Sequence, residues 1–198
     1  MTIMSTNDRR DLRFAEVAEV KFNLLQEHGF KRMQSEPTLV RFESRRAYVN
    51  VYHGRQSFEV GLEIGSLVAG ADETSYSMSE IIRLVDAGEA DGYRNYVAHS
   101  PERVAEGVQR LAMLFSRYVN AGALGDTVLF ERLREGRELW SREYATDVNL
   151  THARQKLGVL WHAKDYPKVV ELLSPLRDAL TPTEVHKLEY AEKHVGRI

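Results

Sequence analysis

Hydrophobic periodicity changes once along this chain, and that change restricts the folds open to it. Between residues 38 and 64 apolar residues alternate with polar or small ones, as in the run from Val49 to Val51. Such alternation is typical of strands with one buried face. From Ser77 onward apolar residues recur every three or four positions, which is typical of amphipathic helices. The sequence therefore predicts an α+β protein, in which a sheet is followed by an all-helical remainder.

The alternating segment predicts three strands. The connections at residues 44–46 and 54–56 are short enough for hairpins, so we expect an antiparallel meander. A sheet of this kind buries one face and leaves the other wetter. Aromatic, amide and charged side chains are expected together on the wetter face: Arg41, Glu43, Tyr48, Asn50, Tyr52, Glu59 and Glu63.

Helix-start and helix-end signals lie on both sides of the meander. A first helix is predicted over residues 8–28, and Gly29 fits the left-handed position after it. Ser77 and Glu80 have capping-box spacing, and Ser100-Pro101 opens a longer helix. A further helix is expected from Asp126 to about residue 144, with a possible kink at Gly136.

The segment 145–151 changes character, because Asp147, Asn149 and Thr151 are competing caps. We interpret it as a boundary between an α+β body over residues 8–144 and a helical tail over residues 147–198. The sequence of the tail predicts a helix hairpin, followed by a last helix that begins at Thr181-Pro182.

The hairpin resembles a tetratricopeptide unit, through the spacing of Leu157-Gly158, Trp161, Asp165-Tyr166 and Pro182. The match covers about one repeat. Two positions where the family has small residues are occupied by Val170 and Arg177. Because one repeat cannot bury its faces alone, the resemblance implies that the tail either caps its own body or binds a partner protein.

Composition and charge narrow the possible functions. The 198 residues are 43% hydrophobic, enough for a real core. Lys and Arg number 27 against 29 Asp and Glu, so we expect neither a nucleic acid nor a membrane as partner. The chain has no cysteine and no apolar run near the roughly 20 residues that cross a bilayer, so we expect a cytoplasmic protein.

Known catalytic and cofactor motifs are missing from the sequence. None of the seven histidines forms an H-E-x-x-H motif, and neither G-x-S-x-G nor a glycine-rich phosphate loop occurs. We therefore expect no catalytic, metal or cofactor site. His53, which ends a strand before Gly54, is a candidate for a polar site, with a turn residue bonded to the backbone as the alternative.

The loop at residues 89–100 carries Tyr93, Arg94 and Tyr96, residue types that are enriched at protein interfaces. They either form an exposed anchor or fold back over the meander and complete the core.

The order of predicted elements is similar to that in bacterial families of unknown function. The residues that carry the resemblance are Gly29-Phe30-Lys31-Arg32 and Phe58-Glu59-Val60-Gly61. Some members of that type look like immunity proteins kept beside toxins. The resemblance spans about residues 10–125 and assigns no functional residue. It implies a bacterial inhibitor that binds a toxin partner.

Two classes of function follow. The first is a non-enzymatic protein-binding protein, whose candidate contact residues are Tyr48, Asn50, Tyr52, Glu59, Glu63, Tyr93, Arg94 and Tyr96. The second is a small-ligand protein or enzyme with a dispersed site built from His53, Tyr52, Glu59 and the 89–100 loop. A concave pocket favours the second class and a flat patch the first. A homodimer is possible through an edge strand or through the lone repeat.

Overall fold

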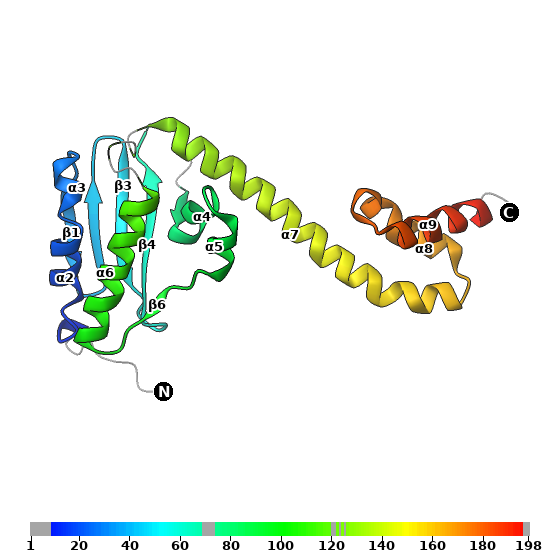
Figure 1. The fold of residues 1–198 in the computed structure, drawn as a ribbon, viewed down its shortest axis with the longest axis horizontal. Coiled ribbons are helices and arrows are strands. Elements are labelled where there is room, and N and C mark those ends of the chain that lie inside the picture. Colours follow the sequence, from blue (N-terminus) through cyan, green and yellow to red (C-terminus); the bar gives the residue numbers. More distant parts are fainter. Residues whose placement is uncertain (1–8, 69–73, 120–121, 123, 125, 196–198) are drawn as a thin grey trace. The chain divides into compact units, whose positions relative to one another are not determined.

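The computed structural model describes residues 9–68, 74–119, 122, 124 and 126–195 (Figure 1). The chain divides into two compact units, Met1–Gly136 and Arg137–Ile198. We call them the sheet unit and the tail unit and describe each by itself. The sheet unit combines helices with an antiparallel sheet, so the predicted α+β class is confirmed.

In the described residues the sheet has six strands, where the sequence predicted three. They are β1 (Lys31–Glu36), β2 (Leu39–Glu43), β3 (Ala47–His53), β4 (Glu59–Ser66), β5 (Ser75–Ser77) and β6 (Tyr96–Val97). The order is β1-β2-β3-β4-β5, with β6 also on β4, and every pairing is antiparallel. The predicted meander corresponds to β2, β3 and β4.

Two features explain why the other strands were not predicted. All but one of the β1 residues are exposed, so no apolar alternation marks this strand. Strands β5 and β6 are too short to show a period. Because β6 lies beyond Ser77, the prediction of an all-helical remainder was wrong at that point.

The first helix is interrupted, where the sequence predicted one helix over residues 8–28. Arg13 has a left-handed backbone (φ 53°) and precedes α2 (Phe14–Lys21), after which α3 (Leu24–Glu27) begins a new turn. Gly29 has a φ of 81°, as its position predicted. The N–H of Phe30 then donates to the carbonyl of Leu25 across 3.1 Å, which closes the helix end.

Helices α2, α4 (Met78–Arg83) and α6 (Pro101–Tyr118) cover one face of the sheet, and α5 (Ala87–Gly92) follows α4 (Figure 1). The predicted caps are confirmed: Ser77 and Glu80 form a capping box, and Ser100 accepts from the N–H of Arg103. The core between helices and sheet includes Phe22, Phe42, Val49, Val51, Leu62, Ile64, Ile82, Val108 and Phe115.

Helix α7 (Thr127–His162) is continuous, and this corrects the predicted boundary at residues 145–151. The hydroxyls of Thr146 and Thr151 donate to the carbonyls of Arg142 and Asp147, each across 2.9 Å. They therefore bond within the helix instead of capping a new one. The division between the two units lies inside α7, after Gly136.

The tail unit contains the end of α7, α8 (Tyr166–Leu173), a 3-10 segment (Ser174–Ala179) and α9 (Pro182–Val195). Its core cluster consists of the buried residues Ala153, Leu157, Val169, Leu173, Leu188 and Ala191, and Leu150 is buried as well. Thr181 and Glu184 bond each other's backbone N–H groups at 2.8 and 3.3 Å, so the predicted cap of the last helix is confirmed. Among the residues described, no helix has both the length and the apolar character needed to cross a membrane.

Candidate functional site on the open face of the sheet

The face of the sheet opposite α2, α4 and α6 is here called the open face. Its side chains come from β2 to β5, because alternate residues of each strand point away from the core. Most are half-buried, although Asn50 at the centre is only 8% exposed. The open face consists of Arg41, Glu43, Tyr48, Asn50, Tyr52, Glu59, Glu63 and Ser75. The sequence predicted all of them except Ser75.

Asn50 is the centre of a hydrogen-bond network that runs across the strands. Its side-chain N–H group donates to Glu63 across 2.9 Å, and its oxygen accepts from Arg41 across 3.3 Å. Ser75 donates to the other oxygen of Glu63 across 2.9 Å, and Arg41 donates to Glu43 across 2.5 Å. The network therefore links four strands and fixes the positions of polar groups that would otherwise move freely.

Two tyrosine rings lie across two glycines of the neighbouring strand. Tyr48 is opposite Gly65, and Tyr52 is opposite Gly61. A Cβ atom added at Gly65 would lie 2.2 Å from Cζ of Tyr48, and one at Gly61 would lie 2.3 Å from Cζ of Tyr52. The glycines therefore provide the space that holds both rings flat against the sheet. The guanidinium of Arg41 stacks on the Tyr48 ring at 4.0 Å.

Tyr93 and Asn95 lie near Tyr52, and the ring of Tyr93 packs against the hydrophobic core. The hydroxyl of Tyr93 donates to the side-chain oxygen of Asn95 across 3.0 Å. Burial raises the pKa of Tyr93 to about 12, and the neighbouring Tyr52 adds to the shift. Burial and the charge of Glu63 also raise the pKa of Tyr52, against a smaller opposing effect of its hydrogen bond with Asn95. Both phenols are therefore neutral at neutral pH.

The other two candidates from the 89–100 loop bond groups outside the network centred on Asn50. The guanidinium of Arg94 is exposed and donates to the carbonyls of Asp91 and Tyr93 at 2.9 and 2.6 Å. Tyr96 packs against α6, where a Cβ atom added at Gly107 would lie 2.7 Å from its ring. Its hydroxyl bonds Glu106. Tyr96 thus covers the core, which was one of its two predicted roles.

His53 lies inside the unit and not on the open face. It is 1% exposed, and its Nε2 lies 2.9 Å from the carbonyl oxygen of Ala98. Because a carbonyl can only accept, Nε2 carries the proton and Nδ1 accepts from Arg9 across 3.0 Å. Burial lowers the pKa of His53. His53 and Tyr52 point to opposite faces, so the dispersed site with Glu59 is not assembled.

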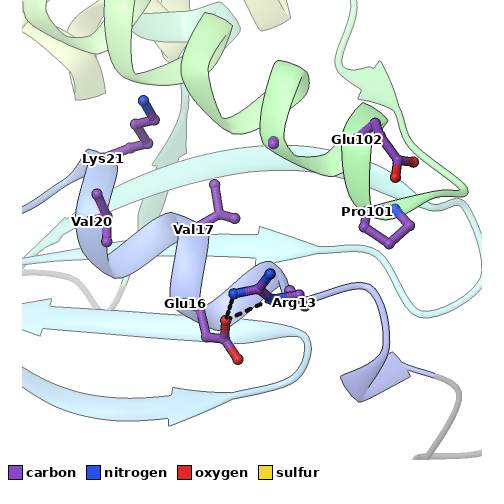
Figure 2. A pocket seen from close by; sticks show the side chains of 8 residues that line it. Arg13, Glu16, Val17, Val20, Lys21, Pro101 and Glu102 are labelled. Atoms are coloured by element: carbon purple, nitrogen blue, oxygen red, sulfur yellow. Dashed lines mark hydrogen bonds and ion pairs between the residues drawn. The ribbon is translucent and has the colours of Figure 1, made fainter.

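A groove of about 500 Å³ lies on the helix side, between α2 and the start of α6 (Figure 2). Its lining is mostly apolar, and Arg13 and Glu16 form an ion pair of 2.6 Å at its rim. The lining residues are Arg13, Glu16, Val17, Val20, Lys21, Pro101, Glu102 and Ala105. They include none of the predicted contact residues. Within the described part of the chain, no group of three or more His, Asp and Glu side chains is placed to hold a metal ion.

Four residues of this site were not predicted: Ser75, Asn95, Gly61 and Gly65. The two glycines carry a readable signal, because they stand four apart in β4 just as Tyr48 and Tyr52 stand four apart in β3. Glycine inside a strand indicates close approach by another group. Ser75 and Asn95 carry no such signal, because Ser75 meets Glu63 of another strand and Asn95 meets Tyr52 of β3 only in the folded chain.

The chain matches no protein-family model, no curated protein and no solved structure.

Proposed function

We propose that this chain is a non-enzymatic protein-binding protein and that the open face of its sheet holds the partner. The main support is the network centred on Asn50, which holds amide, aromatic and charged groups in place across four strands. Groups that are already ordered lose little entropy on binding. Tyr and Arg are also enriched among the residues that contribute most to protein interfaces.

The charge of the open face indicates what kind of surface it would bind. Among its eight residues Arg41 is the single cation, against the carboxylates of Glu43, Glu59 and Glu63, and it is already paired with Glu43. Lys31 and Glu36 of β1 add one charge of each sign on the same side of the sheet. The remaining excess is acidic, so a basic partner surface is complementary. An immunity-like role, in which the partner is a bacterial toxin, agrees with this charge, because a toxin that acts on nucleic acid carries such a surface. The absence of cysteine from the sequence supports a cytoplasmic location.

The test is affinity capture with three forms of the chain, followed by binding measurements on the captured protein. Glu59→Lys reverses a charge on the open face, and Glu131→Lys makes the same change at an exposed position of α7. We expect the wild type and Glu131→Lys to retain the partner, and Glu59→Lys to bind it at least about tenfold more weakly. Added salt should weaken wild-type binding. Equal loss or equal retention in the two variants would contradict the proposal.

For the tail unit we propose packing like that of one tetratricopeptide repeat. The support is the buried contact set of Leu157 and Val169, the left-handed Lys164 at the turn, and Pro182 in the first turn of α9. Arg177 departs from the family pattern, because it is exposed and pairs with Glu192. The Tyr190 ring packs on Trp161, Tyr166 and His194, so Tyr190→Ser should lower the stability of the tail unit, as measured by urea unfolding.

A further inference from the structure

Strand β1 forms one end of the strand order and pairs with β2 on one side only, as far as the described residues go. Five of its six residues are exposed, and Met33 is 61% exposed. An edge strand of this kind presents N–H and C=O groups that can pair with another strand. Strand β1 is therefore a candidate interaction surface, distinct from the open face.

We propose that β1 pairs with β1 of a second copy of this chain, antiparallel and about a twofold axis between Met33 and Gln34. In this register Lys31 is opposite Glu36 of the second copy, and the symmetry repeats the pair. Arg32 is opposite Ser35, and Met33 is opposite Gln34. The strand sequence KRMQSE has a lysine at one end and a glutamate at the other, so two antiparallel copies place opposite charges together at both ends. Opposite charges directly across an antiparallel pair stabilise it.

The side-chain directions in β1 agree with this register. Arg32 and Ser35 both bond Glu19 of α2, so both point to the helix side of the sheet. Gln34 donates to Glu36 across 2.6 Å, so these two share the other side. Residues opposite each other in an antiparallel pair must point to the same side. Arg32 and Ser35 satisfy this condition, because both point to the helix side. Lys31 and Glu36 satisfy it as well, because Lys31 is opposite Glu43 of the open face and therefore points to the same side as Glu36.

The irregularity between Arg32 and Gln34 makes this register possible. Residues three apart normally point to opposite sides of a strand, and the bulge at Met33 brings Arg32 and Ser35 to the same side. By the alternation of antiparallel ladders, we expect both residues to direct their backbone N–H and C=O groups away from β2. They would then bond each other reciprocally across the twofold axis.

Other registers do not form both ion pairs. A shift by one residue turns the facing side chains to opposite sides of the sheet. A shift by two places Lys31 opposite Gln34 and removes the contact with Glu36. The proposed register also makes the two open faces parts of one continuous sheet. The inference does not depend on the function proposed for that face.

The test is sedimentation velocity of the full chain over a range of concentrations. Lys31→Glu and Glu36→Lys each create two like-charge contacts at the interface, so each should weaken dimerisation at least about tenfold. The double variant exchanges the charges and should restore the dissociation constant to within about threefold of the wild type. Glu131→Lys is the matched control, because its neighbour Phe130 contacts Tyr76 of β5, at the other end of the strand order.

Effects within one copy are separated by the choice of variants. Lys31 is opposite Glu43 of its own chain, whereas Glu36 is opposite the uncharged Leu39. Glu36→Lys therefore tests the interface without a new like-charge contact inside the sheet, and thermal unfolding of the dilute protein checks its folding. A wild type that stays monomeric at every concentration would overturn the proposal. So would a dimer that both single variants leave unchanged or that the double variant does not restore.

Discussion

Arg9 donates a hydrogen bond to Nδ1 of His53 across 3.0 Å in the interior of the sheet unit. The same guanidinium stacks on Phe58 at 3.9 Å, and Nε2 of His53 bonds the carbonyl of Ala98. Both ring nitrogens are thus used, and the neutral ring connects the segment before α2, the end of β3 and the segment before α6. A second proton on this ring would meet Arg9 and lose one of the two bonds.

We expect acid to destabilise the protein through His53. Burial, with smaller contributions from Arg9 and His99, lowers the pKa of His53 in the folded chain. The unfolded chain therefore binds the proton first, and the free energy of unfolding falls as the pH drops below about 6.5. One proton contributes a slope of at most about 1.4 kcal/mol per pH unit. Urea unfolding of His53→Gln should lack this slope, whereas His28→Gln, at an exposed position, should keep it.

Tyr48 and Gly65 should be energetically coupled. Gly65→Ala forces the Tyr48 ring off the sheet, because the new Cβ would overlap it, and should cost about 1–2 kcal/mol. In a Tyr48→Ala background the same change should cost much less, giving a coupling energy of about 1 kcal/mol in a double-mutant cycle. Gly88→Ala is the control, since its Cβ would meet only an ordinary contact at 3.5 Å. Strictly additive effects would show that the ring does not lie over this glycine.

Glu184 should make the tail unit sensitive to acid at much lower pH. The Arg154 guanidinium donates two hydrogen bonds to this carboxylate, at 2.7 and 3.2 Å, and holds its pKa at about 2. A depressed carboxyl pKa contributes stability above the unfolded value of about 4.3, and this contribution is lost as the pH falls toward the folded value. Glu184→Gln should therefore lower stability at neutral pH, by no more than about 1 kcal/mol, because the Arg154 side chain is half exposed and solvent screens the pair.

Tryptophan fluorescence measures this effect, because Trp140 and Trp161 both lie in the tail unit. The gap between wild type and Glu184→Gln should close as the pH approaches 2. Glu171→Gln, an exposed carboxylate in α8, serves as the control and should show no such gap. A gap that persists unchanged in acid would mean that the charge of Glu184 is not its cause.

Tyr93 should contribute to a loss of stability in alkali. Its pKa is raised to about 12 in the folded chain, so the unfolded chain gives up the phenolic proton first, from about pH 10. The free energy of unfolding of the wild type should fall as the pH rises from about 10 to about 12. In Tyr93→Phe it should fall less over the same pH range. Tyr144→Phe, at a side chain that is 73% exposed, should behave like the wild type. Ultraviolet absorbance, followed with pH, should show the highest-pH phenol step disappear only in Tyr93→Phe.

The sequence by itself determined the elements whose signals are local. The two-residue alternation located β2, β3 and β4, and short motifs located Gly29 after α3, the box of Ser77 and Glu80, and the cap of Thr181. Each of these depends on residues that lie within four positions of one another. Seven of the eight residues of the open face also followed from alternation, because a strand with one buried face leaves every second side chain on the other.

Only the tertiary structure decided which distant groups meet. The bond between Arg9 and His53 joins residues 44 positions apart. The sequence made His53 a candidate for a polar site, and the structure places it in the interior. Segment 31–36 has no apolar alternation, and it forms strand β1 because it pairs with β2. The predicted helix caps at residues 145–151 do not form, because α7 runs through this segment without a break. For His53 and β1 the physical reason is that burial or pairing with distant residues outweighs a local preference of about 1 kcal/mol. In α7 the threonine hydroxyls bond carbonyls of the same helix, so the residues that could cap a new helix continue the old one.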